Sequence, residues 1–192
     1  MTGLIILAAG ESNRLGRPKQ NLLFQGQTLL QRAVGTALAS ACMPVIVVLG
    51  ANADRIMPIA NANTIYNNDW KEGMASSIRL AVRAITKDAS VSTIIIMLCD
   101  QPFVSAELLN SMIKTQRQTG KSIVACTYNG TTGAPVLFTK AWFTELLLLQ
   151  GQEGAKKIIK AHPGHVATIA FKQGGTDIDT QADYDNLTNL SG

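Results

Sequence analysis

The chain has 192 residues, of which 46% are hydrophobic, 16% charged and only 5% aromatic. A chain of this length can bury a sizeable core within one domain, and that core would consist mostly of Ala, Val, Ile and Leu, as in α/β proteins. The formal net charge of +4 suits an anionic ligand without selecting one. The basic residues form no long run and no aromatic-basic strip, so the sequence argues against nucleic-acid binding.

The cysteines and the amino-terminal segment indicate a cytoplasmic location. Cys42, Cys99 and Cys126 are widely spaced and form no C-x-x-C pair, which is typical of a reducing compartment. The amino terminus leads into an apolar segment without the basic flank and cleavage site of a signal peptide. No apolar stretch approaches the roughly 18 residues that span a membrane. We therefore expect a cytoplasmic protein without a membrane partner.

Apolar runs of strand length alternate with longer segments of helical periodicity, which is typical of βαβ units around a mostly parallel sheet. The first half predicts a strand at 4–8, a helix from the N-cap Thr28 to Leu38, a strand at 45–49, a short helix at 52–60, a short strand at 64–66 and a helix at 74–85. The run at 93–98 is apolar throughout and predicts a central strand buried on both faces.

The second half of the chain continues the same alternation. It predicts a helix at 105–119, strands at 122–126 and 134–138 on either side of the Asn129-Gly130 turn, helices at 141–149 and 153–161, a strand at 166–171 and a last helix from Gln181. No linker, repeat or low-complexity segment interrupts this order. We therefore predict a single α/β domain over residues 1–192, with a mostly parallel central sheet flanked by helices.

The loop after the first predicted strand carries two glycines and three cations. It runs from Leu7 to Lys19 and reads L-A-A-G-E-S-N-R-L-G-R-P-K. Small residues in such a loop let backbone N–H groups approach phosphate oxygens closely. The spacing between Gly10 and Gly16 fits neither the P-loop nor the G-x-G-x-x-G dinucleotide fingerprint. A glycine-bracketed loop alone is equally compatible with a strand-exit turn whose cations are solvated.

A carboxylate follows the predicted central strand, in the sequence Leu98-Cys99-Asp100-Gln101-Pro102. The carboxyl ends of parallel strands are where α/β proteins place ligands. An aspartate there can bind a hard cation such as Mg²⁺ together with triphosphate oxygens. The structural alternative is an aspartate that caps a turn or the next helix.

A third polar segment, residues 67–79, enters the predicted helix at 74–85. It reads N-N-D-W-K-E-G-M-A-S-S-I-R, with Ser76 and Ser77 in the first helical turn. Its structural interpretation is a helix cap by one of these serines and a loop anchored by Trp70.

Together these segments resemble the MobA-like NTP transferase family. The first loop matches the family signature L-A-A-G-x-S-x-R-x-G-x-P-K, Asp100 falls in a D-x-P motif, and residues 67–77 are similar to N-x-x-W-x-x-G-x-x-x-S. The resemblance implies a single-domain Rossmann-like nucleotidyltransferase fold and a set of nucleotide-binding residues. These are Leu7, Ala8, Ala9, Gly10, Ser12, Arg14, Lys19, Asn67, Gly73, Ser76 and Ser77. It also implies that Arg14, Lys19 and Asp100 are catalytic, with Asp100 binding Mg²⁺.

Two later segments resemble motifs for the acceptor and for the metal. Gly133 and Pro135 match a G-x-P at the acceptor side of the family site. Residues 177–180 match its D-I-D-T, which implies a second metal carboxylate; we assign Asp179, although the sequence leaves Asp177 open. Where the family often has G-D-x-G-A, this chain has Gln152 in place of the aspartate, and the lost charge bears on the identity of the acceptor.

The resemblance is strongest to the molybdenum cofactor cytidylyltransferases. It implies transfer of CMP from CTP to molybdopterin-bound molybdenum, release of pyrophosphate, and a molybdoenzyme that receives the product. Ala9 favours CTP, because guanylyl-type relatives have L-A-G-G and the extra methyl group should crowd a purine. Two alternatives stay open: an NTP transferase acting on another phosphorylated acceptor such as a sugar phosphate, and a non-catalytic protein that delivers the finished cofactor.

Overall fold

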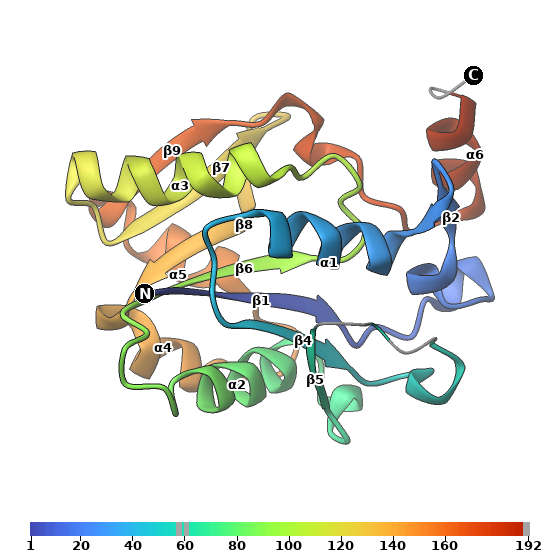
Figure 1. Ribbon diagram of the computed structural model, residues 1–192, viewed down its shortest axis with the longest axis horizontal. Coiled ribbons are helices and arrows are strands. Elements are labelled where there is room, and N and C mark those ends of the chain that lie inside the picture. Colours follow the sequence, from blue (N-terminus) through green and yellow to red (C-terminus); the bar gives the residue numbers. More distant parts are fainter. Residues whose placement is uncertain (57–58, 60–61, 190–192) are drawn as a thin grey trace.

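A seven-stranded sheet forms the centre of the protein, seen in a computed structural model that describes residues 1–56, 59 and 62–189 (Figure 1). The strand order is β5-β4-β1-β6-β8-β7-β9. The strands are β1 (Thr2–Ala8), β4 (Val45–Leu49), β5 (Asn63–Tyr66), β6 (Thr93–Leu98), β7 (Ile123–Tyr128), β8 (Thr131–Thr139) and β9 (Val166–Ala170). In this sheet β8 runs antiparallel to β6 and β7, and the other pairings are parallel. The predicted fold class is confirmed.

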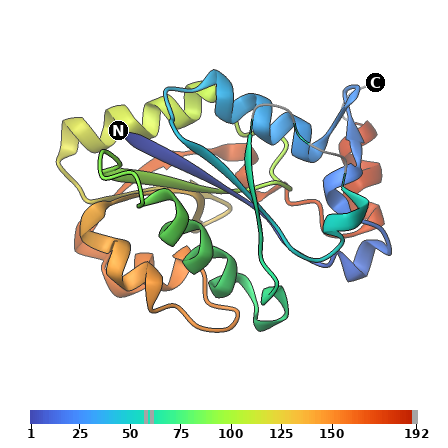
Figure 2. The same ribbon diagram turned by 60° about the horizontal axis from the view of Figure 1, so that its bottom comes forward.

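Helices cover both faces of the sheet (Figures 1 and 2). The α-helices are α1 (Leu29–Ala39), α2 (Met74–Ile85), α3 (Ala106–Thr119), α4 (Phe143–Leu147), α5 (Ala155–Ala161) and α6 (Gln181–Asn189). Helices α1 and α3 pack on one face, and α2, α4 and α5 pack on the other. The 3-10 turns are Asn13–Leu15, Lys19–Asn21, Ala53–Arg55, Trp70–Glu72, Lys140–Trp142, Pro163–His165 and Lys172–Gly175. Within the described residues, no helix is both long and apolar enough to cross a membrane.

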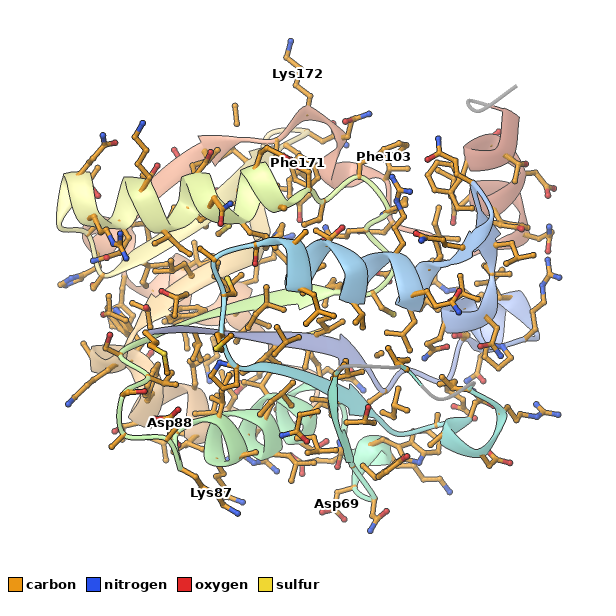
Figure 3. All side chains as sticks on the ribbon, in the orientation of Figure 1. Asp69, Lys87, Asp88, Phe103, Phe171 and Lys172 are labelled. Atoms are coloured by element: carbon orange, nitrogen blue, oxygen red, sulfur yellow. The ribbon has the colours of Figure 1, made fainter. Side chains whose placement is uncertain are left out.

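The apolar strands separate two core layers. Leu4 and Ile6 of β1 face α1 and α3, whereas Ile5 and Leu7 face α2. Successive side chains of a strand point to opposite faces, so a strand covered on both sides must be apolar throughout. This is why the run at 93–98 is β6, the central strand between β1 and β8. In Figure 3, side chains fill the space between the sheet and its helices, and the labelled Lys87, Asp88 and Lys172 lie at the periphery.

The predicted start of α1 is confirmed by its cap. The Thr28 hydroxyl accepts a hydrogen bond from the backbone N–H of Gln31, and the Gln31 side chain accepts one from the backbone N–H of Thr28. This reciprocal pair satisfies two N–H groups that have no partner inside the helix. The predicted α2 and β6 match the observed elements residue for residue.

Some predicted elements are shorter or longer in the structure. Of the helix expected at 52–60, the structure has a 3-10 turn at Ala53–Arg55, and residues 57, 58 and 60 lie outside the described part of the chain. The helix expected at 141–149 is a 3-10 turn followed by the five residues of α4. Helix α5 begins at Ala155, two residues after the predicted start, because the Glu153 carboxylate accepts from the backbone N–H of Gln150 in the preceding turn.

The remaining differences concern strands. Strands β7 and β8 extend up to the predicted turn, where Asn129 and Gly130 have φ of 48° and 70°, as a tight hairpin requires. A small hairpin of β2 (Leu23–Phe24) and β3 (Gln27–Thr28) lies in a segment that was not predicted to contain strands.

A third apolar cluster joins the first loop to the carboxyl-terminal segment. Its buried members are Leu15, Leu22, Phe24, Leu29, Ile178 and Leu187. Ile178 is fully buried, and its backbone N–H donates to the carbonyl oxygen of Asp100 at 3.3 Å. Packing of Ile178 thereby places the residues on either side of it next to the carboxyl end of β6.

Candidate active site

Two cations and two carboxylates meet beyond the carboxyl ends of β1 and β6. The Lys19 Nζ lies 2.5 Å from the Asp100 Oδ2 and 2.8 Å from the Asp179 Oδ1. The Arg14 Nη2 lies 2.7 Å from the Asp179 Oδ2. The side chains of Lys19 and Asp100 are 14% and 11% exposed, whereas that of Arg14 is 68% exposed. The cluster therefore has a nearly buried inner pair and a solvent-facing arginine at its rim.

The electrostatic environment favours the charged forms of Lys19 and Asp179. Burial acts to lower the pKa of Lys19, but the Asp100 charge and the hydrogen bonds that Lys19 donates to both carboxylates raise it above the ordinary lysine value. Partial burial acts to raise the pKa of Asp179, but Lys19 and Arg14 hold it below the ordinary aspartate value. Nearby Asp177 behaves differently: removal from water, followed by the charge of Asp100, raises its pKa to about 6.

The loop that carries Lys19 is held by its own polar groups. Ser12 adopts a left-handed conformation with φ of 60°, and its hydroxyl accepts from the backbone N–H of Lys19 at 3.1 Å. Gln20 is fully buried, and its Nε2 donates to the carbonyl oxygens of Ala8 at 2.6 Å and Gly10 at 3.3 Å. Sequence reasoning missed Gln20, because a polar residue inside a glycine-rich loop gives no signal that distinguishes it from a solvated one.

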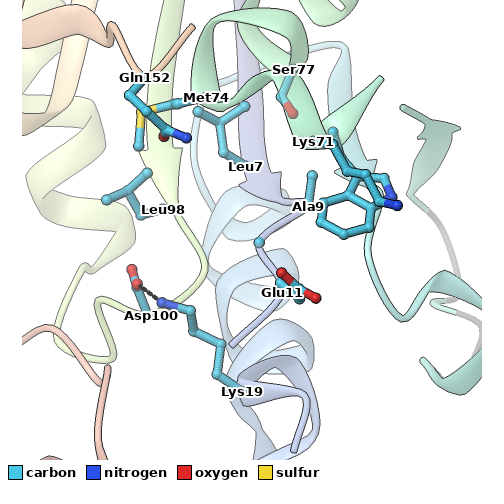
Figure 4. A pocket seen from close by; sticks show the side chains of 12 residues that line it. Leu7, Ala9, Glu11, Lys19, Lys71, Met74, Ser77, Leu98, Asp100 and Gln152 are labelled. Carbon is cyan, nitrogen blue, oxygen red and sulfur yellow. Dashed lines mark hydrogen bonds and ion pairs between the residues drawn. The ribbon is translucent and has the colours of Figure 1, made fainter. Parts of the chain in front are cut away.

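A cavity of about 330 Å³ opens beside the Lys19–Asp100 pair (Figure 4). Its lining includes six of the predicted site residues: Leu7, Ala9, Gly10, Lys19, Ser77 and Asp100. Six further lining residues were not predicted to contact the nucleotide: Glu11, Trp70, Lys71, Met74, Leu98 and Gln152. Motif matching missed them because it marks fixed positions, whereas the lining depends on how separate segments pack.

Other predicted nucleotide residues lie behind this lining in the described structure. The Asn67 Nδ2 donates to the hydroxyls of Ser76 at 2.8 Å and Ser77 at 2.9 Å. The Ser76 hydroxyl donates to the carbonyl oxygen of Gly73 at 2.8 Å. Asn67 and Ser76 are each only 4% exposed, so they brace the turn that presents Ser77. Ala8, Ser12 and Arg14 likewise lie outside the cavity lining, in the strand end and loop around it.

Gly73 permits a close contact between two loops. Its φ is 123°, and a Cβ there would lie 2.4 Å from the carbonyl oxygen of Gly151. No other residue type fits this approach without a shift of the backbone. The contact holds residues 150–154, and with them Gln152, over the cavity.

The predicted acceptor residues Gly133 and Pro135 lie on β8, next to the residue that follows Asp100. The Gln101 Nε2 donates to the carbonyl oxygens of Ala134 at 3.3 Å and Gly174 at 3.1 Å. A Cβ on Gly133 would lie 2.5 Å from the Tyr128 Oη, so the glycine leaves room for that ring. This segment is thus tied to the turn that follows β6 and carries Asp100, although it does not line the cavity.

The residues present fit a hard divalent cation. The Asp100 Oδ1 is buried and has no hydrogen-bond partner among the described residues. The Asp100 Oδ2 contacts the Lys19 ammonium group, which also contacts Asp179. No group of three or more His, Cys, Asp or Glu side chains suited to a metal occurs in the described chain. Mg²⁺ often uses only one or two protein carboxylates and takes its other ligands from substrate phosphates and water. Asp100 and Asp179 match that pattern.

The fold is that of the nucleotidyltransferases. The family model described as the MobA-like NTP transferase domain matches residues 4–166, and the chain belongs to this family. The matched region includes the first loop, Asp100 and the predicted acceptor residues Gly133 and Pro135, and it ends before Asp179. The resemblance inferred from the sequence motifs is confirmed.

Named relatives cover different parts of the chain. The nicotine blue oxidoreductase of Paenarthrobacter nicotinovorans is 37% identical over 120 residues, which is 59% of this chain and 56% of that protein. The purine catabolism protein PucB of Bacillus subtilis is 28% identical over 94% of this chain and 93% of its own. The molybdenum cofactor cytidylyltransferase of Escherichia coli is 25% identical over 94% of this chain and 92% of its own.

Solved structures share the complete fold. Rv0371c of Mycobacterium tuberculosis superposes with a TM-score of 0.86 at 30% identity, covering 98% of this chain and 97% of that one. A structure of Rv0371c in complex with manganese has a TM-score of 0.81 at 27% identity and covers 98% of both chains.

Proposed function

We propose that this protein is a Mg²⁺-dependent cytidylyltransferase that transfers CMP from CTP to the molybdopterin-bound molybdenum cofactor in the cytoplasm. The observation that carries the proposal is the buried Lys19–Asp100 pair, shared with Asp179, beside a cavity formed by the glycine-bracketed loop. The named function of the E. coli relative, which aligns with nearly the whole chain, supports the choice of acceptor. A molybdoenzyme would receive the product.

The reaction needs alignment and charge neutralisation more than a protein nucleophile. A phosphate oxygen of the acceptor attacks the α-phosphorus of CTP, the bond between the α-phosphorus and its bridging oxygen breaks, and pyrophosphate leaves. Backbone N–H groups of the loop at 10–16 would hold the triphosphate oxygens. Lys19 and Arg14 would offset the negative charge that grows on the leaving pyrophosphate.

Asp100 and Asp179 would hold the metal ion in this proposal. When bound, Mg²⁺ supplies positive charge to the phosphate oxygens and favours departure of pyrophosphate. The pKa of Asp179 is lowered despite its partial burial, which keeps this carboxylate ionised for such a role. Asp179 is preferred to Asp177 because Asp179 contacts the same ammonium group as Asp100.

The decisive experiment compares four α-labelled NTPs with purified molybdenum cofactor and Mg²⁺. We expect pyrophosphate release and a labelled cofactor product with CTP in preference to the other nucleotides. Pyrophosphate release that requires a sugar phosphate instead would identify a different acceptor. Tight binding of the cofactor without turnover of any NTP would mean that the protein is a carrier and would refute the proposed reaction.

A further inference from the structure

The ammonium group of Lys19 occupies the space between the two proposed metal ligands. It contacts the Asp100 Oδ2 at 2.5 Å and the Asp179 Oδ1 at 2.8 Å. A metal ion that bridges the Asp100 Oδ2 and the Asp179 Oδ1 would enter the space that this ammonium holds. Two cations cannot share it, because charges of the same sign repel strongly at such separations where water is largely excluded.

Within this cluster, each charged group contacts a group of opposite charge. Lys19 and Arg14 face Asp100 and Asp179, which gives two positive and two negative groups in direct contact. A free divalent ion would therefore have to displace a counter-ion that is covalently tethered to the site.

Lys19 can leave the carboxylates without a rearrangement of its loop. Its backbone N–H is held by the Ser12 hydroxyl, and the next residue, Gln20, is anchored to Ala8 and Gly10. Its side chain already lines the cavity, and lysine has a flexible four-carbon stem. Rotation of that stem toward the cavity would move the ammonium group away from the carboxylate oxygens and toward the phosphate oxygens of a bound triphosphate.

We propose that Lys19 is a tethered counter-ion that blocks the metal position until a triphosphate draws it away, so that the metal ion enters with the nucleotide and not before it. This inference rests on the proposed function, since it assigns a triphosphate to the cavity. The inference gives Lys19 two roles. Before the nucleotide binds, Lys19 excludes a free divalent ion, and after the nucleotide binds, Lys19 contacts its phosphates.

The test measures Mn²⁺ binding to the full-length, metal-free protein in the absence of nucleotide, by titration calorimetry or from the paramagnetic resonance signal of free Mn²⁺. The Lys19→Met variant keeps the length of the side chain but removes its charge. We expect Lys19→Met to bind Mn²⁺ at least about tenfold more tightly than wild type, because the Lys19 ammonium no longer competes with Mn²⁺ for the carboxylates. Its turnover should nevertheless fall by about a hundredfold, because a phosphate-binding cation is lost.

Two further variants make the test specific. Lys71→Met removes an equal charge from another lysine that lines the same cavity, and its Mn²⁺ affinity should stay close to that of wild type. Adding Asp100→Asn to Lys19→Met should abolish the gain in affinity. If Lys19→Met does not fold, Lys19→Gln serves in its place, because it removes the charge and keeps a hydrogen-bond donor beside the carboxylates.

The outcomes separate this inference from the proposed function. Equal Mn²⁺ affinity of wild type and Lys19→Met without nucleotide would overturn the inference, while CTP-dependent pyrophosphate release by wild type would still support the proposed reaction. Conversely, tighter Mn²⁺ binding by Lys19→Met with no turnover of any NTP by wild type would support the counter-ion role and refute the reaction.

Discussion

Asp100 follows β6, where an aspartate can serve either as a metal ligand or as a helix cap. The structure assigns the cap of α3 to another residue, since the Ser105 hydroxyl accepts from the backbone N–H of Leu108 at 3.2 Å. Asp100 instead faces Lys19, and its Oδ1 has no partner among the described residues. A structural role as the cap of that helix is therefore excluded, and the ligand role stays a prediction.

Replacing Asp100 by Asn should separate metal binding from stability. The amide keeps the size of the side chain but removes the charge that makes it a good ligand for a hard cation. We expect turnover to fall by about a hundredfold or more and the Mg²⁺ concentration for half-maximal rate to rise. The melting temperature should change little, because Lys19 keeps its contact with Asp179. A large loss of stability with an unchanged Mg²⁺ titration would contradict the ligand role.

Ala9 is the residue that we expect to select the nucleobase. It directly follows β1 and lines the cavity, and it belongs to the core layer opposite to that of Ala8. Ala9→Gly should raise kcat/KM for GTP relative to CTP by about tenfold, the effect of one methyl group in a close-fitting pocket. Ala8→Gly adds the same backbone freedom on the opposite face and should leave the ratio unchanged. The CTP assignment would be wrong if wild type used GTP as well as CTP.

The segment at 150–154 depends for its position on Arg79 of α2 and on Glu72 in the 3-10 turn before α2. Arg79 pairs with both carboxylate oxygens of Glu72 at 2.7 and 2.6 Å and donates to the carbonyl oxygen of Leu149 at 2.7 Å. Glu72 also accepts from the backbone N–H of Gly151 at 3.3 Å. Hydrogen bonds from Arg79 lower the pKa of Glu72, so this contact is present at neutral pH and weakens as pH falls through that lowered value.

Arg79→Ala should release this segment and with it Gln152, which lines the cavity. We expect a KM increase of a few fold for CTP or for the acceptor, with a smaller change in kcat, because an ordered wall of the pocket is lost. Lys157→Ala is the matched control, since it removes an exposed ion pair with Glu153 that should contribute little. Steady-state kinetics of both variants make the comparison. Unchanged KM values in Arg79→Ala would mean that the pairing does not position the cavity wall.

The three apolar clusters decide how distant segments meet. The two large ones fill the layers between sheet and helices, and the third packs the first loop against the carboxyl-terminal segment. Figure 1 shows α6 beside β2, at the end of the molecule where the first loop also lies. Folding of the chain and completion of the site are therefore coupled through Ile178, which precedes Asp179.

Ile178→Ala should cost about 2–5 kcal/mol of unfolding free energy, because it leaves a cavity in the third cluster. It should also raise the Mg²⁺ concentration needed for activity, since Asp179 loses its anchor. Ile158→Ala is a control of the same size, because Ile158 is also fully buried but packs in the layer with α2 and α4. Urea unfolding and Mg²⁺ titration of both variants give the answer. Identical Mg²⁺ curves would show that the third cluster does not position the second carboxylate.

Much of the fold could be predicted from the sequence because the spacing of apolar residues indicates which side of an element is buried. A helix presents apolar residues at every third or fourth position, and a strand covered on both faces is apolar throughout, so α2 and β6 were predicted with their observed bounds. Thr28 marked a helix start because its hydroxyl suits the unpaired N–H groups there. The small hairpin of β2 and β3 was missed, since strands of two residues have no period to read.

The sequence by itself determined the fold class, the family and the loop, aspartate and serine motifs, because each depends on residues close together in the chain. Only the tertiary structure decided which of them meet. Lys19 and Asp179 are 160 residues apart, and they touch because the buried face of Ile178 packs against the first loop. Likewise Ser77 faces the cavity while Asn67 and Ser76 brace it from behind. The physical reason is that a local pattern shows which side of an element is buried, whereas contacts between distant side chains depend on which buried surfaces pack together.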